Sequence, residues 1–458
     1  MRLLIIGGSD AGISAALRAR ELSSTAHITV ILADDYPNFS ICGLPFYLSG
    51  ETPDWKQLSH RTEFDGIEIL RGHRATQIDA PNGFVLVRHQ DKSKALSFDR
   101  LIVATGAKPV EPPIKGLQSP GVFPLHTMEH SFQIQQYIAQ NNVKSALIIG
   151  AGYIGVEMAD ALTHRGLTVT LASRAATVLP SVEPELGRLV EQELRSQGVA
   201  LWTGVEIKGI ERRSGDLNIS SSQAEERAAD LVIIATGVQP DSALARQADI
   251  ELGHHGAIRV NRSMETNIPG VFAAGDCVET WHRLLASCTY LPLGTTSHKQ
   301  GRVAGENAVG GRALFAGSVG TQVVKVFGLA IARTGLLERE ARDAGFDPFT
   351  VQTETWDHKA YYPGAKQLWL RVTGDQSSNR LLGAQIVGAS TSEVAKRIDV
   401  FASALYHGMI VEALNELDLS YTPPLSSPWD PIQVAAQAWS RAVQTTQIQD
   451  QIREKTSV

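Results

Sequence analysis

Cysteine is scarce in this chain: its 458 residues contain three, Cys42, Cys277 and Cys288. Three thiols this far apart do not form the disulfide framework of a small secreted domain. The sequence also has no Cys-x-x-Cys pair and no group of Cys and His residues with zinc-binding spacing. We therefore expect reduced cysteines and no metal site.

Long apolar runs and an excess of basic residues are absent too. The longest largely apolar stretch without charge, Ser145 to Val156, is far shorter than the roughly 20 residues of a membrane-spanning helix. Glycine interrupts the apolar N-terminus after Ile6, which leaves too short a core for a signal peptide. With 42 Lys and Arg against 48 Asp and Glu, the net charge of −6 does not suit a nucleic-acid-binding protein. We expect a cytoplasmic protein with no nucleic-acid or membrane partner.

Glycine, in contrast, is abundant, and it punctuates two units of strand, glycine turn, helix and strand. The first unit spans 2–34 and the second spans 144–173. In each, a short apolar strand ends in glycine, and apolar residues at helical spacing follow. The length corresponds to about three domains. The sequence therefore predicts an α/β protein with two Rossmann-like nucleotide-binding domains.

The second unit carries a complete Gly-x-Gly-x-x-Gly motif, Gly150 to Gly155. The first glycine permits the turn, the second admits a pyrophosphate, and the third lets helix and strand pack closely. The helix N-terminus adds donors for the phosphates. We expect a dinucleotide to contact Gly150, Gly152, Tyr153, Ile154 and Gly155.

The residues that end the next strand bear on the choice between NADH and NADPH. An acid there binds the ribose of NAD, whereas an Arg accommodates the 2′-phosphate of NADP. This strand ends in Ala172, Ser173 and Arg174, with no acid. We favour NADPH, held by Arg174 and Ser173; the alternative is an exposed Arg on an enzyme that uses NADH.

The first unit is a weaker motif because Ser stands where the second Gly belongs. Its turn consists of Gly7, Gly8, Ser9, Asp10, Ala11 and Gly12. Asp34 follows at about the distance of a ribose-binding acid, although Asp35 leaves the register open. Gly275 and Asp276 end a later strand, where the Asp could hydrogen-bond the ribityl chain of FAD. Without a flavin, this pair would be an ordinary turn.

Two near-copies of one segment, 98–109 and 229–240, each place Ala-Thr-Gly after an apolar strand. We expect these residues, too, to contact cofactor: Ala104, Thr105, Gly106, Ala235, Thr236 and Gly237. From about residue 320, short strands alternate with helices, which indicates a third domain. A polar stretch without periodicity, 442–458, predicts a loose tail.

These features together resemble the FAD-dependent pyridine nucleotide–disulfide oxidoreductases. The motif NFSICGLPFYLSG at 38–50 is similar to that of the single-cysteine branch: coenzyme A disulfide reductases, NAD(P)H oxidases and peroxidases, and persulfide reductases. Further similar segments are LPLGTTSHKQGRVAGEN (291–307), ARTGLLEREA (332–341), YYPGA (361–365) and YTPPLSSPWDPI (421–432). The resemblance implies an FAD-binding domain at 1–111 and 243–320, an NAD(P)-binding domain at 112–242, and a C-terminal α+β dimerisation domain at 321–441 that forms a homodimer.

The resemblance also implies that Cys42 is the redox centre, lying against the flavin. Tyr47 stands where the two-cysteine members have their second thiol. Cys42 is therefore expected to be oxidised by an external partner, to a mixed disulfide, a persulfide or a sulfenic acid, and to be activated by a lowered pKa. A buried structural thiol is the alternative, and it is how we interpret Cys277 and Cys288.

Other site residues follow from the same resemblance. In the coenzyme A disulfide reductases, tyrosines of the interface domain reach the cysteine, which implicates Tyr361, Tyr362 and Tyr421; ordinary packing at a dimer interface is the alternative. Glu157 is expected near the nicotinamide. The helix at the pyrimidine end of the flavin is expected to begin with Gly294, Thr295, Thr296 and Lys299. Arg18, Arg20, His60 and Arg61 are possible contacts for coenzyme A phosphates.

Three functions remain open at this point. The first is NADPH-dependent reduction of a low-molecular-weight disulfide, persulfide or polysulfide through FAD and Cys42. The second is a water-forming NAD(P)H oxidase, which the family resemblance disfavours because Asp10 replaces the oxidase His. The third is a slow flavin redox sensor or electron-transfer protein.

Overall fold

The computed structural model describes residues 1–61, 63–213 and 215–456. Its first sheet has five parallel strands in the order β18-β7-β1-β2-β3. Strands from both ends of residues 1–320 therefore share one sheet. The strands are β1 (Arg2–Ile6), β2 (His27–Ile31), β3 (Ile67–Leu70), β7 (Arg100–Val103) and β18 (Val271–Ala273).

Both faces of this sheet are covered, which explains why its strands are apolar throughout. Side chains of α1 (Asp10–Leu22) and α7 (Gly294–Ala308) pack on one face. An antiparallel sheet of β4 (Arg74–Asp79), β5 (Phe84–His89) and β6 (Lys92–Ser97) packs on the other.

The second parallel sheet, in the order β12-β11-β10-β16-β9, repeats this plan. Its strands are β9 (Val122–Pro124), β10 (Ser145–Ile149), β11 (Thr168–Ser173), β12 (Ala200–Thr203) and β16 (Leu231–Ile234). The helices α3 (Met128–Gln140), α4 (Tyr153–His164) and α5 (Pro184–Ser196) contribute to the core on one side. On the other side lies an antiparallel sheet of β13 (Ile207–Arg213), β14 (Asp216–Ser221) and β15 (Glu226–Ala229).

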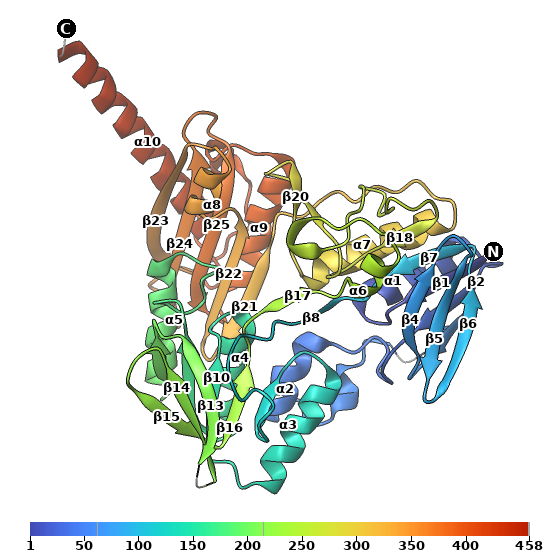
Figure 1. Cartoon of the computed structure of the whole chain (residues 1–458). Helices are drawn as coiled ribbons and strands as arrows, with labels where there is room; N and C mark the ends of the chain where they lie inside the picture. Colours follow the sequence, from blue (N-terminus) through green and yellow to red (C-terminus); the bar gives the residue numbers. More distant parts are fainter. Residues whose placement is uncertain (62, 214, 457–458) are drawn as a thin grey trace.

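Two short strands join these parts, and they come from the two Ala-Thr-Gly near-copies. β8 (Ala107–Pro109) pairs antiparallel with β17 (Val238–Pro240), so the two crossings between the sheets run side by side (Figure 1). The short helix α6 (Ala243–Gln247) follows the second crossing.

The third sheet is antiparallel, in the order β21-β22-β25-β24-β23. Its strands are β21 (Gln322–Val326), β22 (Leu329–Gly335), β23 (Pro348–Trp356), β24 (Gln367–Asp375) and β25 (Leu381–Ala389). The helices α8 (Glu338–Asp343), α9 (Val394–His407) and α10 (Pro431–Thr456) pack with it, and the hairpin of β19 (Thr280–His282) and β20 (Ser287–Thr289) precedes it.

The architecture confirms the expected fold class of two Rossmann-like sheets and a C-terminal α+β part. The expectation of a loose polar tail is wrong for most of its length, because α10 continues to Thr456. Buried Trp439 and Val443 anchor the first part of this helix in the third core. The exact domain boundaries remain a prediction.

Candidate active site

The first glycine turn is built so that two of its glycines admit no side chain. A Cβ on Gly7, whose φ is +112°, would lie 2.0 Å from the carbonyl oxygen of Ala104, and one on Gly12 would lie 1.9 Å from that of Gly7. Ser9 is the N-cap of α1, but its side chain makes no capping hydrogen bond. The backbone donors of the first helical turn therefore point to the carboxyl edge of the sheet, an arrangement that suits a diphosphate.

The second turn repeats this geometry. A Cβ on Gly150 (φ +111°) would lie 2.2 Å from the oxygen of Ala235, and one on Gly155 would lie 1.8 Å from that of Gly150. A Cβ on Gly152 would meet nothing within 4 Å. Packing inside the protein therefore does not explain this glycine, whereas the approach of a pyrophosphate does. The N-termini of α4 and α1 are equivalent, which suits two dinucleotide cofactors.

Asp276 lies beside the first turn, at the start of α7. Its Oδ1 accepts a hydrogen bond from the Ser297 hydroxyl at 2.7 Å, and burial raises its pKa. Gly275 packs on α1, since its Cβ would come within 2.7 Å of the Ala11 Cβ. The other carboxylate oxygen is left for a hydroxyl donor, so Asp276 fits the ribityl role expected for FAD. Asp34 is exposed beyond the end of β2, where its Oδ1 accepts from the Tyr36 amide at 2.9 Å.

Cys42 lies in a short 3₁₀ turn, Ile41–Gly43, directly before α2 (Leu44–Ser49). The segment is fastened to the first glycine turn by a hydrogen bond from the Asn38 amide to the Gly8 oxygen, 2.9 Å. The guanidinium of Arg165, which follows α4, holds the other end by donating to the Leu48 oxygen at 2.8 Å. The exposed Cys42 thiol is thus supported from both nucleotide-binding parts.

The surroundings of Cys42 are anionic. Although the residue is reached by solvent, protein on most sides reduces the hydration of its sulfur, and this raises the pKa of the thiol. The charges of Asp10, Glu157 and Asp276 raise the pKa further. The expectation of a lowered pKa is therefore wrong for the polypeptide without its cofactors. Among the described residues, no positively charged side chain offsets the effect of these carboxylates on the pKa of Cys42.

Glu157 lies one turn into α4 and is half-buried. Burial raises its pKa to about 7, and the charge of Asp160 adds to the effect while that of Lys325 opposes it. A carboxyl group with this pKa can hold or release a proton near neutral pH.

Ser173 and Arg174 end β11 as the sequence predicts. The buried Ser173 hydroxyl accepts from the Ala175 amide at 3.1 Å, which turns the chain and leaves Arg174 exposed. Arg174 also lies near Glu206, whose pKa is lowered chiefly by a hydrogen bond from Lys208 and in part by the charge of Arg174. A cationic side chain beside this strand end suits a 2′-phosphate.

The threonines of the two Ala-Thr-Gly segments form hydrogen bonds with the chain segments that cross between the two parallel sheets. Thr105 donates to the Asp241 oxygen at 2.5 Å, and Thr236 donates to the Val110 oxygen at 3.0 Å. Gly106 and Gly237 both have positive φ. The carbonyl oxygens of Ala104 and Ala235 face the glycine turns, as described above. A cofactor-binding role of the two Ala-Thr-Gly segments, residues 104–106 and 235–237, remains a prediction.

The tyrosines make contacts within their own part of the chain. Tyr361 is 73% exposed and has a hydrogen-bonding contact with Tyr421, and Tyr362 packs edge-on against His358 with ring centroids 5.9 Å apart. All three lie on the C-terminal part, whereas Cys42 precedes α2 (Figure 1). Their role at Cys42 remains a prediction.

The start of α7 is partly as expected. Gly294 approaches α1, since its Cβ would lie 3.1 Å from Asp10 Oδ2. Thr296 is buried and donates to the Ser318 hydroxyl at 3.4 Å, while Thr295 and Lys299 are exposed. A flavin contact by these residues remains a prediction.

Two of the four residues considered for coenzyme A phosphates already have partners. Arg18 pairs with Glu306 at 2.6 Å and with Glu21 at 2.8 Å. Arg20 donates to four backbone oxygens, those of Ser23, Ser24, Ala26 and Gly66. His60 and Arg61 are exposed. A contact of any of the four residues with coenzyme A phosphates remains a prediction.

The other thiols differ from Cys42 and from each other. Cys277 is fully buried, and burial raises its pKa to about 11. This confirms the expectation of a buried thiol. Cys288 is only half-buried, contrary to expectation, because it lies on the small hairpin strand β20.

His298 is a site residue that the sequence did not reveal. From α7 its Nδ1 lies 2.8 Å from the Ser14 hydroxyl and its Nε2 lies 3.5 Å from Asp10 Oδ1. These partners are 284 and 288 positions away along the chain, so no local pattern indicates them.

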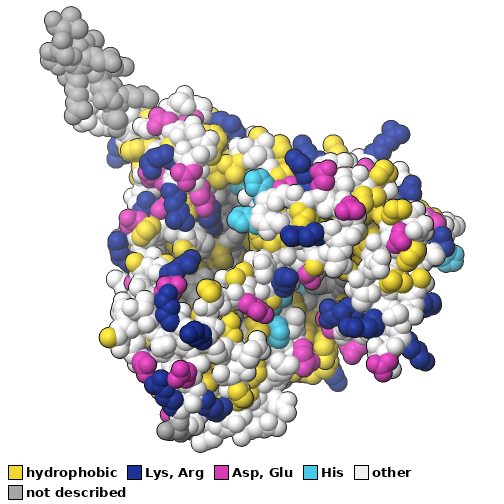
Figure 2. Space-filling view, viewed as in Figure 1, with side chains coloured by type: hydrophobic (Ala, Val, Ile, Leu, Met, Phe, Trp, Pro, Cys, Tyr) yellow, Lys and Arg dark blue, Asp and Glu magenta, His cyan; other side chains and the backbone are white. Residues whose placement is uncertain are grey.

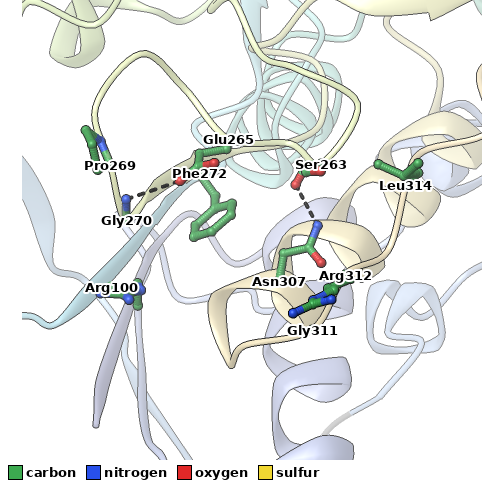
Figure 3. A pocket seen from close by; sticks show the side chains of 10 residues that line it. All are labelled: Arg100, Ser263, Glu265, Pro269, Gly270, Phe272, Asn307, Gly311, Arg312 and Leu314. Atoms are coloured by element: carbon green, nitrogen blue, oxygen red, sulfur yellow. Dashed lines mark hydrogen bonds between the residues drawn. The ribbon is translucent and has the colours of Figure 1, made fainter.

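A surface hollow of about 550 Å³ lies elsewhere, at the opposite edge of the first sheet (Figure 3). Arg100 and Gly270, at the beginnings of β7 and β18, line it together with Asn307 near the end of α7. Ligands of such sheets bind at the carboxyl ends of the strands, so we do not assign this hollow to the active site. Figure 2 shows a separate hollow near the middle of the molecule, between its two halves in that view.

In the described part of the chain, no group of three His, Cys, Asp or Glu side chains is placed so that it could hold a metal ion. Nor does this part include a helix of sufficient length and apolarity to cross a membrane.

Comparison with known proteins gives consistent matches. Residues 1–301 match the profile of the pyridine nucleotide-disulphide oxidoreductases, and 321–431 match the dimerisation domain of the same family. The NAD(P)H sulfur oxidoreductase (CoA-dependent) of Pyrococcus abyssi is 36% identical over 95% of this chain and 97% of the relative. An NADH oxidase of Methanocaldococcus jannaschii is 32% identical over 95% and 98%. The structure of an NAD-dependent persulfide reductase from A. fulgidus is 36% identical with a TM-score of 0.93, covering 96% of this chain and 83% of that one.

Proposed function

The chain belongs to the pyridine nucleotide-disulphide oxidoreductases, and on this premise we propose that it reduces the disulfide, persulfide or polysulfide of a low-molecular-weight thiol through Cys42. It is an FAD-dependent NAD(P)H oxidoreductase. The observation that carries the proposal is the isolated, exposed Cys42 thiol between the two nucleotide-binding parts. The other described cysteines lie elsewhere and are buried or half-buried.

A single thiol limits the chemistry available at this site. When bound, FAD supplies two-electron transfer between the nicotinamide and sulfur. Cys42 forms a bond to one sulfur of the substrate and expels the other, and it is regenerated as a thiol when that bond is reduced. The names of the relatives, a CoA-dependent sulfur oxidoreductase and a persulfide reductase, support sulfur substrates of this kind.

The chain's own residues have separate tasks in this proposal. The turns at Gly7–Gly12 and Gly150–Gly155 hold the two diphosphates, and Asp276 orients the ribityl chain. Glu157 lies at the nicotinamide with a pKa of about 7. Arg174 and Ser173 favour NADPH over NADH, although the persulfide reductase relative is named for NAD.

The tyrosines act in a homodimer. The match of 321–431 to a dimerisation domain supports self-association. Tyr361, Tyr362 and Tyr421 are exposed together with Leu425 and Trp429. We propose that this surface contacts a second copy and that its tyrosine hydroxyls hydrogen-bond or protonate sulfur at the Cys42 of that copy.

A reducing compartment keeps three free cysteines reduced, so we infer a cytoplasmic location.

Water-forming NAD(P)H oxidation is the second candidate, supported by the relative named NADH oxidase. The family resemblance disfavours it, because Asp10 stands where the oxidase branch has His. Purified protein should be assayed for NADPH consumption with and without oxygen against a panel of coenzyme A disulfide, other disulfides and polysulfide. Anaerobic turnover that depends on a sulfur substrate supports the reductase, and turnover that depends on oxygen alone overturns it. Slow turnover with every acceptor would indicate the sensor or electron carrier.

A further inference from the structure

Two segments carry the tyrosines of the proposed dimer surface, and both contact one buried arginine. The segment 357–366 connects β23 to β24 and includes Tyr361. The segment 421–430 begins with Tyr421 and ends directly before α10. Arg397 of α9 contacts both segments, and its side chain is only 8% exposed. A charged side chain withdrawn this far from water is stable only with partners for its donors.

The guanidinium of Arg397 distributes its donors over both segments. Its Nη2 donates to the Asp357 carbonyl oxygen at 2.7 Å, and its Nη1 donates to the Ser392 carbonyl oxygen at 2.6 Å, just before α9. Its Nε lies 3.4 Å from Asp430 Oδ2. One side chain therefore joins the first residue of one tyrosine segment to the last residue of the other.

Asp357 closes the first segment into a loop. Its amide donates to the Lys366 carbonyl oxygen and its Oδ1 accepts from the Lys366 amide, both at 2.9 Å. Its Oδ2 accepts from the Ser392 hydroxyl at 2.7 Å. The Nδ1 of His358, whose ring packs edge-on against Tyr362, lies 2.8 Å from the same carboxylate. The base of the loop is thus fixed on the side away from Tyr361.

Asp430 fixes the second segment in a similar way. Its Oδ2 accepts from the Ser426 hydroxyl at 2.8 Å, and its Oδ1 accepts from the Ile432 amide at 3.0 Å, at the start of α10. Its own amide donates to Gln433 Oε1 at 3.2 Å. The carboxylate therefore ties the segment to α10 as well as to Arg397.

The two segments also contact each other directly. The Lys359 amide donates to the Pro423 carbonyl oxygen at 3.3 Å. The side chains of Tyr361 and Tyr421 have a hydrogen-bonding contact, although both are exposed. The tyrosines are thus joined to each other on the surface, while their segments are joined through Arg397 in the interior.

We propose that Arg397, with Asp357 and Asp430, is the positioning element that holds Tyr361 and Tyr421 as one pair for the Cys42 of the second copy. This inference deepens the proposed function and rests on it. The network touches neither sulfur nor cofactor, and it acts through the tyrosines. A pair that is already fixed in the single chain loses less conformational freedom when two copies meet. It also presents both hydroxyls at one spacing, and a misplacement of about 1 Å can slow a reaction about a hundredfold.

Three variants test the network in the FAD-bound enzyme. Arg397→Met removes the donors at similar side-chain length, whereas Ser392→Ala and Ser426→Ala each remove one hydroxyl and keep every charge. All three should retain FAD and be reduced by NADPH within about twofold of the wild-type rate. Reoxidation by coenzyme A disulfide or polysulfide should slow about tenfold in Arg397→Met and about threefold in each Ser variant. The two Ser variants decide the matter if Arg397→Met yields no folded dimer.

Ser377→Ala is the matched control. The Ser377 hydroxyl donates to Asp375 Oδ2 at 2.7 Å, the same kind and length of hydrogen bond as that from Ser392 to Asp357. It lies at the opposite end of β24 from the tyrosine loop. This variant should be reduced and reoxidised at wild-type rates.

A tyrosine-free background distinguishes positioning from a general structural effect. In a chain with Tyr361→Phe and Tyr421→Phe, reoxidation should already be slow. Adding Ser392→Ala or Arg397→Met should then slow it by less than about twofold, because the network acts through residues that are no longer functional. A full further loss in this background would overturn the positioning role.

Mixed dimers provide the second readout. A dimer of one Cys42→Ser copy and one Arg397→Met copy has one site with intact Cys42 and intact tyrosines, provided that the tyrosines act across the interface. When purified by two different tags, it should recover about half of the wild-type sulfur-dependent turnover, since a two-fold dimer has two equivalent sites. Turnover no higher than that of the Arg397→Met homodimer would overturn the proposal.

The failure of this proposal and that of the proposed function are distinguishable. Wild-type reoxidation in Ser392→Ala, Ser426→Ala and Arg397→Met, with slow reoxidation in the tyrosine-free chain, would overturn the network and leave the proposed function intact. Wild-type sulfur-dependent turnover in the Cys42→Ser homodimer would instead overturn the proposed function.

Discussion

The NADPH site can be tested by a single methyl group. Gly152 has φ −79° at the N-cap of α4, a conformation that alanine adopts without strain, and its Cβ would meet no protein atom within 4 Å. Gly152→Ala should therefore lower the free energy of unfolding by less than about 1 kcal/mol. The methyl group would occupy the space through which the pyrophosphate approaches the helix amides.

The expected loss follows from the hydrogen bonds at that helix end. One charge-assisted hydrogen bond contributes about 1.5–3 kcal/mol, so losing one should raise the Kd for NADPH about 10- to 150-fold. The Kd is measured from the rate of flavin reduction at increasing NADPH, and stability from thermal unfolding. Gly155→Ala is the contrasting variant, because its Cβ would lie 1.8 Å from the Gly150 oxygen and should destabilise the fold itself. Unchanged NADPH affinity in a Gly152→Ala protein that retains FAD would refute this assignment of the second glycine turn.

Two other site residues lead to separate predictions. Arg174→Ala should raise the KM for NADPH about tenfold and leave that for NADH nearly unchanged, in parallel steady-state assays; a wild-type preference for NADH of about tenfold (1.4 kcal/mol) would contradict the Arg174 assignment. Glu157 has its pKa raised from 4.5 to about 7, so the folded protein binds a proton that the unfolded chain releases within this window, and its stability falls as pH rises through it. The Tm of Glu157→Gln relative to wild type should therefore increase from about pH 5 to pH 7.5 in thermal scans, and a constant difference would argue against the buried acid.

The sequence predicted what depends on local pattern. Gly150, Gly152 and Gly155 occupy the turn that their spacing indicates, and the strand order joins residues from both sides of the inserted unit, as the resemblance implied. Contacts between distant residues were not predictable in this way. Nothing in the sequence shows that the two Ala-Thr-Gly segments pair with each other, or that His298 meets Asp10.

The partners of charged side chains and the extent of the C-terminal helix were also hard to predict from the sequence, because both depend on contacts between distant residues. Arg18 and Arg20 appear as free cations in the sequence, but their acceptors come from Glu306 and from backbone oxygens that only the fold brings near. The polar C-terminal stretch lacks an apolar stripe, yet it continues a helix whose buried Trp439 is already anchored. Similarly, the pKa of Cys42 depends on its burial and on carboxylates from three separate parts of the chain.

The central claim is that Cys42 is the redox-active thiol, and Cys42→Ser tests it most directly. The substitution changes side-chain volume little, so FAD content and flavin reduction by NADPH should persist, while anaerobic NADPH oxidation dependent on a disulfide or polysulfide should fall by at least about a hundredfold. Cys277→Ser and Cys288→Ser, assayed in parallel, should retain most of this activity. Wild-type turnover in Cys42→Ser, with loss in either of the other two variants, would contradict the account.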